Sequence, residues 1–307
     1  MKIGLMLGGG GAKGSYQIGV LEVLEKYRLL DQVSIISGAS IGAINGYFYL
    51  GSNLEGLKAS WLYGIKNNPI GKKVNIRGGG LWSIEVLKEI ASKYIEEEKF
   101  KNSEQLLYII STEIKSPSLK SYLFKSQWEE KITLLNEVEN PVDYVISSAS
   151  IPVVFGAKEI KEKYYIDGGL INNNPLDILI KEGCELVFAV PLEKPINYQK
   201  QESANVTVVE LTDLNIFPKG IGQLLSIVDF DLVEMENRIE YAKYTTEEML
   251  KECLKRGILK FENGNYHVSS LKEGLNVITL PAYVKATLQN MIYLNYQKRK
   301  EKTNGNN

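Results

Sequence analysis

A serine between glycines, in Gly38-Ala39-Ser40-Ile41-Gly42, is the part of the sequence whose residue types and spacing point most directly to chemistry. In a G-x-S-x-G segment between a strand and a helix, a tight turn projects the serine hydroxyl off the sheet edge as a nucleophile. The following helix adds the positive end of its dipole nearby. A serine in this place is also a common helix N-cap, so the pattern alone allows both interpretations.

Asp167, in the segment Ile166-Asp167-Gly168-Gly169, is the leading candidate for the base that a serine nucleophile requires. The two glycines after it let the backbone leave the preceding strand steeply, so the carboxylate can point into a site. An Asp-Gly hairpin turn is the structural alternative. Because Asn172–Asn174 and Pro175 continue an irregular polar loop, the simple hairpin is the weaker interpretation.

Four consecutive glycines open the segment GGGGAKG at 8–14, which follows an apolar run and precedes a predicted helix. Such a loop presents backbone amides to an anion. Lys13 is out of register for a phosphate P-loop, which excludes that interpretation. The spacing Gly9-x-Gly11-x-x-Gly14 fits a dinucleotide fingerprint, but the acidic residue expected at the end of the second strand is missing, since Asp31 precedes that strand.

In a third interpretation of this loop, the amides of Gly9, Gly10 and Gly11 form an oxyanion hole for acyl transfer. The alternative is a turn that serves only close packing of a helix on the sheet. Consecutive glycines cost conformational entropy on folding, and four exceed what packing needs. The sequence therefore favours a functional loop.

A succession of strands and helices must position these segments. Apolar runs at 3–7 and 33–37 predict buried parallel strands, and 3.6-residue periodicity predicts helices over 15–28 and after Ser40. This is the beginning of a parallel α/β sheet. Further predicted elements are helices at 84–95 and 142–149 and strands at 106–114, 120–125 (as the partner of 106–114), 163–166, 185–191 and 206–211.

The character of the chain changes to helical after about residue 213. Long helical periodicity runs through 219–256 and again through 282–300. We therefore expect a catalytic domain at 1–212, a helical extension packed on it at 213–300, and a disordered polar tail at 301–307.

The amino-acid composition argues against several classes of protein function. The 36 basic and 37 acidic residues argue against a nucleic-acid-binding protein, and the two cysteines are too few for a disulfide framework. No apolar stretch approaches the length of a signal peptide core or a membrane span, so a cytoplasmic location is expected. The one histidine, His267, excludes a His-rich metal site but allows a Ser40–Asp167–His267 triad.

Taken together and in this order, the segments at 8–14, 38–42 and 167–169 resemble the patatin-like phospholipase family. Its signature is a G-G-G-x-[K/R]-G loop, a G-x-S-x-G serine and a D-G-[G/A] aspartate. The resemblance covers about residues 3–190 and includes GGLWS at 79–83, STEI at 111–114 and SSASIPVVF at 147–155. It departs where Gly156-Ala157 replaces the Pro-Pro of many relatives.

The resemblance implies a three-layer α/β/α fold with a mostly parallel sheet and a helical extension at the C-terminal end. It also implies a lipid acyl hydrolase that needs no cofactor or metal. Ser40 matches the nucleophile, Asp167 the base of a histidine-free dyad, Gly9, Gly10 and Gly11 the oxyanion loop, and Lys13 its basic position. A triad with His267, and a non-hydrolytic dinucleotide-binding protein, stay open as alternatives.

The substrate class follows from the resemblance as an ester of a lipid or another acyl compound. Trp61, Tyr63 and Trp82 lie around the glycines at 78–80 and belong either to the core or to a region that meets the lipid interface. The basic tail is either solvated or in contact with anionic headgroups. The sequence thus leaves peripheral contact with a membrane open, and it leaves the oligomeric state open as well.

Overall fold

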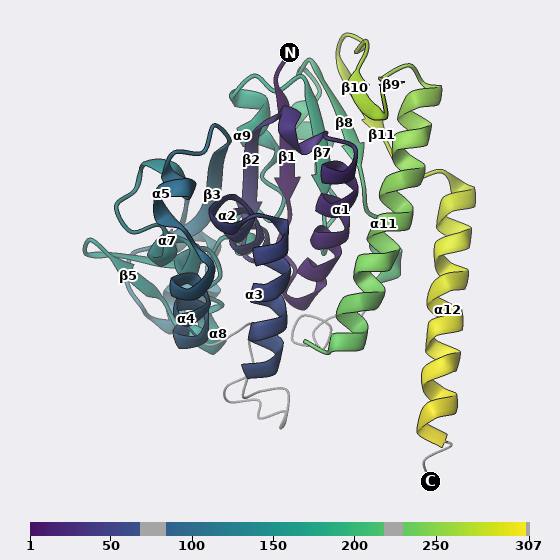
Figure 1. The fold of residues 1–307 in the computed structure, drawn as a ribbon. Coiled ribbons are helices and arrows are strands. Elements are labelled where there is room, and N and C mark those ends of the chain that lie inside the picture. The colour runs from purple at the N-terminus through teal and green to yellow at the C-terminus, as the bar shows by residue number, and fades with distance from the viewer. Residues whose placement is uncertain (68–83, 218–229, 305–307) are drawn as a thin grey trace.

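A three-layer α/β/α arrangement is seen in the computed structural model, which describes residues 1–67, 84–217 and 230–304 (Figure 1). Within these residues, a nine-stranded sheet has the order β11-β8-β7-β1-β2-β3-β6-β5, with β4 also paired to β3. The strands are β1 Ile3–Leu7, β2 Val33–Ala39, β3 Leu106–Ile114, β4 Trp128–Leu134, β5 Lys158–Ile160, β6 Lys163–Asp167, β7 Leu186–Val190, β8 Val206–Glu210 and β11 Leu275–Ile278.

Helices cover both faces of the sheet, and the larger core lies on the face packed against α1, α2 and α3. A smaller core lies on the face packed against α9. The helices are α1 Ser15–Lys26, α2 Ile41–Ser52, α3 Leu54–Asn67, α4 Ile84–Tyr94, α5 Glu97–Lys101, α6 Leu119–Leu123, α7 Pro141–Ser148, α8 Pro152–Phe155, α9 Leu176–Lys181, α11 Leu232–Lys255 and α12 Ala282–Asn304.

The strand directions bring the chemically interesting segments to one edge of the sheet. The central strands β1, β2 and β3 are parallel, so the glycine loop after β1 and Ser40 after β2 leave at the same carboxyl edge. Strand β6 runs antiparallel to β3, with Asp167 opposite Ser111. Ile110, the residue before Ser111 in β3, lies opposite Ala39, the residue before Ser40. The end of β6 is therefore level with Ser40, although β6 runs in the opposite direction to β2.

The predicted strand at 120–125 is wrong. This segment contains the short helix α6, and the partner of β3 is the later strand β4. Ser118 caps α6 by accepting a hydrogen bond from the amide of Ser121, which favours a helical turn over an extended strand.

The described residues after 213 are largely helical, in α11 and α12, but they also contain strands that the sequence analysis did not predict. The first part of the helix predicted at 219–256, residues 219–229, lies outside the described residues. A hairpin of β9, Leu259–Glu262, and β10, Asn265–Val268, follows α11. Strand β11 then joins the sheet beside β8, in parallel. Helix α12 continues to Asn304, so it includes four residues of the tail expected to be disordered. The division at residue 212 stays a prediction.

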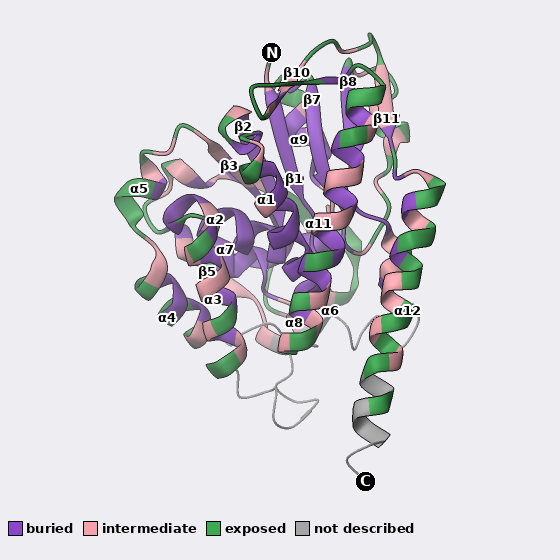
Figure 2. Cartoon of the chain, turned by 45° about the vertical axis from the view of Figure 1, so that its right-hand side comes forward, coloured by how far each residue is buried: buried purple, intermediate pink, exposed green. Residues whose placement is uncertain are grey.

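Helix α11 is packed closely on α1. Gly19 of α1 lies against the backbone of Ile239 and the side chain of Ala242. The hydroxyl of Tyr16 donates to the carbonyl of Leu211 at 2.8 Å and also contacts Thr245 of α11. The extension therefore covers part of the face on which the main core lies (Figure 2).

Trp61 belongs to the core, since it is buried and its ring nitrogen donates to Asn45 Oδ1 at 2.8 Å. Tyr63 is half-buried and bonds to Glu89. Trp82 lies outside the described residues. Among the described residues, no helix has the length and apolar character that a membrane span requires.

Candidate active site

Ser40 occupies a strained turn between β2 and α2. Its φ of 53° and ψ of −120° are rare for a residue with a side chain, and such strain is typical of a nucleophile elbow. The flanking glycines make the turn feasible. A Cβ on Gly38 would lie 2.7 Å from the Ala43 nitrogen, and one on Gly42 would collide with the carbonyl oxygen of Leu7. The elbow thus depends on glycine at both positions.

The hydroxyl of Ser40 points at the carboxylate of Asp167. Ser40 Oγ donates to Asp167 Oδ2 at 2.5 Å, and both residues are buried. The backbone amide of Ser40 donates to Ser148 Oγ at 3.0 Å, which ties the elbow to α7. The structure therefore brings together the two residues that the sequence analysis assigned as nucleophile and base.

Three further hydrogen bonds hold Asp167 in place. Its second carboxylate oxygen accepts from the amide of Gly169 at 2.8 Å. Its carbonyl accepts from Thr112 Oγ1 at 2.8 Å, and its amide donates to the carbonyl of Ser150 at 2.8 Å. These hydrogen bonds involve both the main chain and the side chain of Asp167, and they hold its carboxylate toward Ser40.

Burial sets the proton affinity of this carboxylate. Loss of hydration raises the pKa of Asp167 to about 6, although the hydrogen bonds from Ser40 and Gly169 favour the charged form. A carboxylate with a pKa near neutrality is better matched to proton transfer from a hydroxyl than an exposed aspartate. The raised pKa is therefore compatible with the general-base role predicted for Asp167.

The glycine loop lies directly beside the serine. A Cβ on Gly9 would lie 3.2 Å from Ser40 Cβ and 2.6 Å from Asn173 Oδ1, so only glycine fits. Of the three amides expected to face an oxyanion, that of Gly9 instead donates to the Asn173 carbonyl at 3.1 Å. In return, Asn173 Nδ2 donates to the Gly9 carbonyl at 3.1 Å.

The next two amides are differently placed. Gly11 is the first residue of a 3₁₀ turn at Gly11–Gly14, where the leading N–H groups have no acceptor within the helix. The amides of Gly10 and Gly11 have no hydrogen-bond acceptor among the described residues. They are therefore the donors of this loop that can meet a developing oxyanion.

Lys13 is buried in the same turn. Its ammonium group lies 5.6 Å from the ring centroid of Phe217, and burial lowers its pKa. The neighbouring Arg238, from α11, donates to the carbonyl of Ala12 at 3.0 Å. A basic side chain of the extension is therefore bonded to the turn that contains Lys13.

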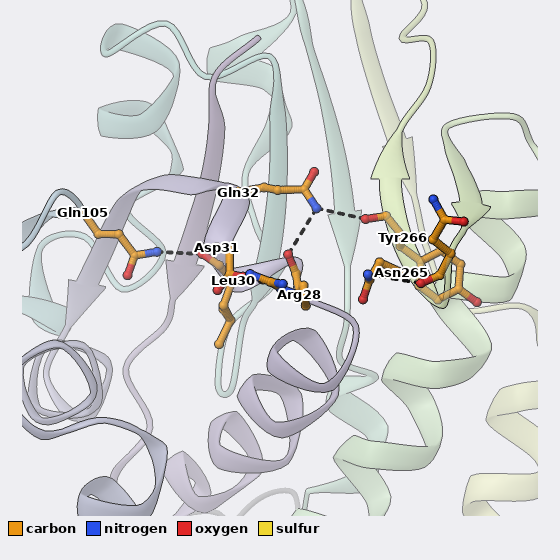
Figure 3. Close-up of polar contacts among 8 residues, drawn as sticks. Arg28, Leu30, Asp31, Gln32, Gln105, Asn265 and Tyr266 are labelled. Atoms are coloured by element: carbon orange, nitrogen blue, oxygen red, sulfur yellow. Dashed lines mark hydrogen bonds and ion pairs between the residues drawn. The ribbon is translucent and has the colours of Figure 1, made fainter.

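His267 is placed at the opposite end of the sheet. The carbonyl of its neighbour Tyr266 accepts from Gln32 Nε2 at 2.9 Å (Figure 3). Gln32 precedes β2, whereas Ser40 follows it, and the seven residues of this strand span roughly 20 Å. The structure does not bring His267 to Ser40.

Asp31, the acidic residue that precedes the second strand, lies at that same amino end. Its carboxylate accepts from Arg28 Nε at 2.8 Å (Figure 3). A dinucleotide site would need the acidic group at the carboxyl end of β2. That position is taken by the serine elbow instead.

Four residues that support this site were not predicted as such: Thr112, Ser148, Ser150 and Asn173. Three of them lie in segments, STEI and SSASIPVVF, that carry the family resemblance, and Asn173 lies in the polar loop after Asp167. The sequence thus contained a signal for each segment. The hydrogen-bond partners became known only from the fold.

A serine elbow, an aspartate at a strand end and a glycine loop, side by side on a three-layer α/β/α sheet, define a hydrolase-like arrangement of nucleophile, base and amide donors. Residues 5–180 match the family described as Patatin-like phospholipase. As this match covers more than half of the chain, the protein belongs to the patatin-like phospholipase family.

Curated relatives are similar over part of their length. The chain is 28% identical over 193 residues to the probable lipid hydrolase 463L of Invertebrate iridescent virus 6, covering 58% of this chain and 63% of that protein. It is 26% identical over 253 residues to the lysophospholipase NTE1 of Kluyveromyces lactis, covering 79% of this chain but 16% of the yeast protein. The chain thus spans less than two thirds of either relative.

Solved structures align with this chain at low TM-score and low identity. The type III effector protein ExoU aligns with a TM-score of 0.41 and 15% identity over 82% of this chain and 53% of that chain. VipD from Legionella pneumophila aligns with a TM-score of 0.37 and 15% identity over 64% of this chain and 50% of that chain.

Proposed function

We propose that this protein is a lipid acyl hydrolase that cleaves carboxylic ester bonds through a Ser40–Asp167 dyad. The observation that carries the proposal is the 2.5 Å hydrogen bond from Ser40 Oγ to Asp167 Oδ2, made at a strained elbow beside a glycine loop. Membership in the patatin-like family, and relatives named lipid hydrolase and lysophospholipase, support a lipid ester as substrate.

In the proposed acylation step, Asp167 takes the proton of Ser40, and the serine oxygen attacks the ester carbonyl carbon. The amides of Gly10 and Gly11 stabilise the oxyanion of the tetrahedral intermediate. An amide donor of this kind is worth about 3 kcal/mol in the transition state. The intermediate collapses with loss of the alcohol, which takes the proton from Asp167 and leaves an acyl group on Ser40.

In the deacylation step, Asp167 takes a proton from water, and the resulting hydroxide attacks the acyl-serine carbonyl. Collapse releases the carboxylic acid and returns the proton to Ser40 Oγ. The sum is one ester and one water converted to one acid and one alcohol. Neither step uses an imidazole, a metal or a cofactor.

The test is hydrolysis of a short-chain p-nitrophenyl ester by the wild type and three variants. Ser40→Ala and Asp167→Asn should each lower kcat by about 10³-fold or more, since nucleophile and base act as one unit. His267→Ala should retain wild-type kcat. A folded His267→Ala protein without activity would favour the triad, and an inactive wild type that binds a dinucleotide tightly would favour the nucleotide-binding alternative.

A further inference from the structure

The connection between β3 and β4, residues 115–127, buries one serine and exposes three large apolar side chains. In α6 and the residue that follows it, Leu119 is 72% exposed, Leu123 63% and Phe124 56%. Ser121 of the same helix is 3% exposed. This is the reverse of the pattern that the hydrophobic effect favours for a surface helix in water.

Hydrogen bonds to the helix fix this reversed orientation. The Ser118 hydroxyl caps α6 by accepting from the amide of Ser121 at 3.3 Å. The ring nitrogen of Trp128, at the start of β4, donates to the carbonyl of Ser121 at 2.7 Å. The bond from Trp128 holds the side of α6 that carries Ser121 against the start of β4, and the two leucines and the phenylalanine are exposed.

The same segment is basic. Lys115, Lys120 and Lys125 are exposed, and residues 115–127 contain no aspartate or glutamate. The whole chain has a formal net charge of −1, so this segment is more basic than the chain as a whole. Exposed apolar side chains interleaved with lysines suit the boundary between lipid headgroups and acyl chains, where the leucines enter and the ammonium groups meet phosphates.

The segment extends beyond the catalytic level of the sheet. Ile110 of β3 lies opposite Ala39, the residue before Ser40, and β3 continues for four more residues to Ile114. At about 3.3 Å per residue, β3 ends about 13 Å past the level of Ala39 on the side of the carboxyl edge, and α6 begins five residues later. Figure 2 shows α6 and α8 at the same end of the molecule, and a Cβ on Gly156, the residue after α8, would lie 3.9 Å from the hydroxyl of Tyr122 in α6.

We infer that residues 115–127 are a docking surface for an anionic lipid surface, with Leu119, Leu123 and Phe124 inserted and the three lysines at the headgroups. This inference rests on the proposed function for its purpose, because docking here would turn the carboxyl edge of the sheet, and Ser40, toward the lipid. Binding itself does not require that the ester is cleaved.

The test is co-sedimentation of the full chain carrying Ser40→Ala with vesicles of phosphatidylcholine and phosphatidylserine. In this background, Leu123→Ser with Phe124→Ser should lower the partition coefficient by about tenfold or more. Lys120→Gln with Lys125→Gln should lower it about fivefold per lysine on these vesicles, and much less on vesicles of phosphatidylcholine alone.

The matched control removes one leucine and one phenylalanine at the opposite end of the molecule. Leu254 lies in the last turn of α11 and Phe261 lies in the β9–β10 hairpin, and both are exposed. Leu254→Ser with Phe261→Ser should bind vesicles like the Ser40→Ala parent. Circular dichroism would show that all variants are folded.

Equal binding by the Leu123/Phe124 variant and the control would overturn the inference. So would an absence of vesicle binding by the parent, or a dimer in sedimentation velocity that the Leu123/Phe124 substitutions dissociate, because a second copy would then be the occupant. Vesicle binding that depends on this segment, in a wild type that cleaves no soluble ester, would instead refute the proposed function and leave the docking surface in place.

Discussion

Ser40 and Asp167 form a hydrogen-bonded pair, and we propose that the serine proton moves to the aspartate without a histidine. The carboxylate is buried, held by Gly169 and bonded to the serine hydroxyl at 2.5 Å. Burial raises the proton affinity of Asp167, and this makes an aspartate a more effective base near neutral pH. The consequence is a pH dependence that belongs to a carboxyl group.

We predict that kcat/KM for a soluble ester rises with pH through a midpoint near 6, the value to which burial raises the pKa of Asp167. Below this pH, the carboxyl group is protonated and cannot accept the serine proton; above it, the base is available and the rate levels off. The measurement is the pH–rate profile of the wild type, with His267→Ala as the control that should keep the same midpoint. A midpoint near 4, typical of an exposed aspartate, would contradict this description of the site.

Asn173 is predicted to position the glycine loop. It is bonded to both the amide and the carbonyl of Gly9, and Gly9 contacts Ser40. Asn173→Ala removes the side-chain bond and leaves room for the loop to shift. We expect kcat to fall by about 10- to 100-fold with little change in KM, since small misplacements of amide donors reduce catalysis strongly.

The control for this prediction is the adjacent Asn172→Ala. The amide group of Asn172 bonds to Glu130 and Asp177 and not to the glycine loop. Its kcat should therefore stay close to that of the wild type. Equal losses in both variants would indicate a general effect on the loop after Asp167 and would refute a specific role for Asn173.

Helix α2 must approach β1 closely for the elbow to form. A Cβ at Gly42 would collide with the carbonyl of Leu7, at the end of β1, and would lie 3.0 Å from that of Gly8. We predict that Gly42→Ala lowers the free energy of unfolding by about 1–3 kcal/mol and also reduces activity, because the backbone that must move carries the glycine loop.

Gly46→Ala in the same helix is the matched comparison. The nearest atom to its Cβ is a methyl group of the Leu107 side chain at 2.9 Å, which can rotate away. Alanine also stabilises a helix interior relative to glycine, so the net change should be small. Chemical denaturation of both variants measures the difference, and an equal effect at the two positions would contradict the argument.

Elements with strong local patterns could be predicted from the sequence. Apolar runs predicted β1 and β2, helical periodicity predicted α1, and the helices expected at 84–95 and 142–149 are α4 and α7. Helix α6 was missed because its apolar residues face away from the protein, so burial periodicity gives no guide to it. Strand β11 was missed because four residues become a strand only beside β8, nearly 70 positions earlier.

The same distinction applies to the site. Ser40 and Asp167 were predictable because the glycines next to each residue indicate a tight turn of the backbone there. The hydrogen bonds from Ser40 to Ser148 and between Gly9 and Asn173 join residues more than 100 positions apart. No local pattern specifies such partners, and the use of the Gly9 amide by Asn173 could not have been foreseen.

The catalytic and C-terminal parts share one core. Buried residues of α11, including Met249, Leu250 and Cys253, belong to the same hydrophobic cluster as those of α1 and β1. Arg238 of α11 bonds to the glycine loop, and β11 completes the described sheet beside β8. The extension is therefore part of the folding unit that positions the site.

We predict that a chain ending at residue 212 does not fold independently. The truncation deletes α11 and β11, which would expose the apolar face of α1 and leave β8 as an unpaired edge strand. The full chain should show one cooperative thermal transition, and the truncated chain none. A truncated chain that melts cooperatively and hydrolyses esters would show that the region before residue 213 is an autonomous domain.

The central claim is that Ser40 is a nucleophile activated by Asp167 alone. The most direct measurement is labelling with a fluorophosphonate followed by mass mapping of the modified peptide, in the wild type and in the Asp167→Asn and His267→Ala variants. The adduct should be on Ser40, form at the wild-type rate in His267→Ala, and be lost or strongly slowed in Asp167→Asn. An adduct on another residue, or its loss in a folded His267→Ala protein, would contradict the account.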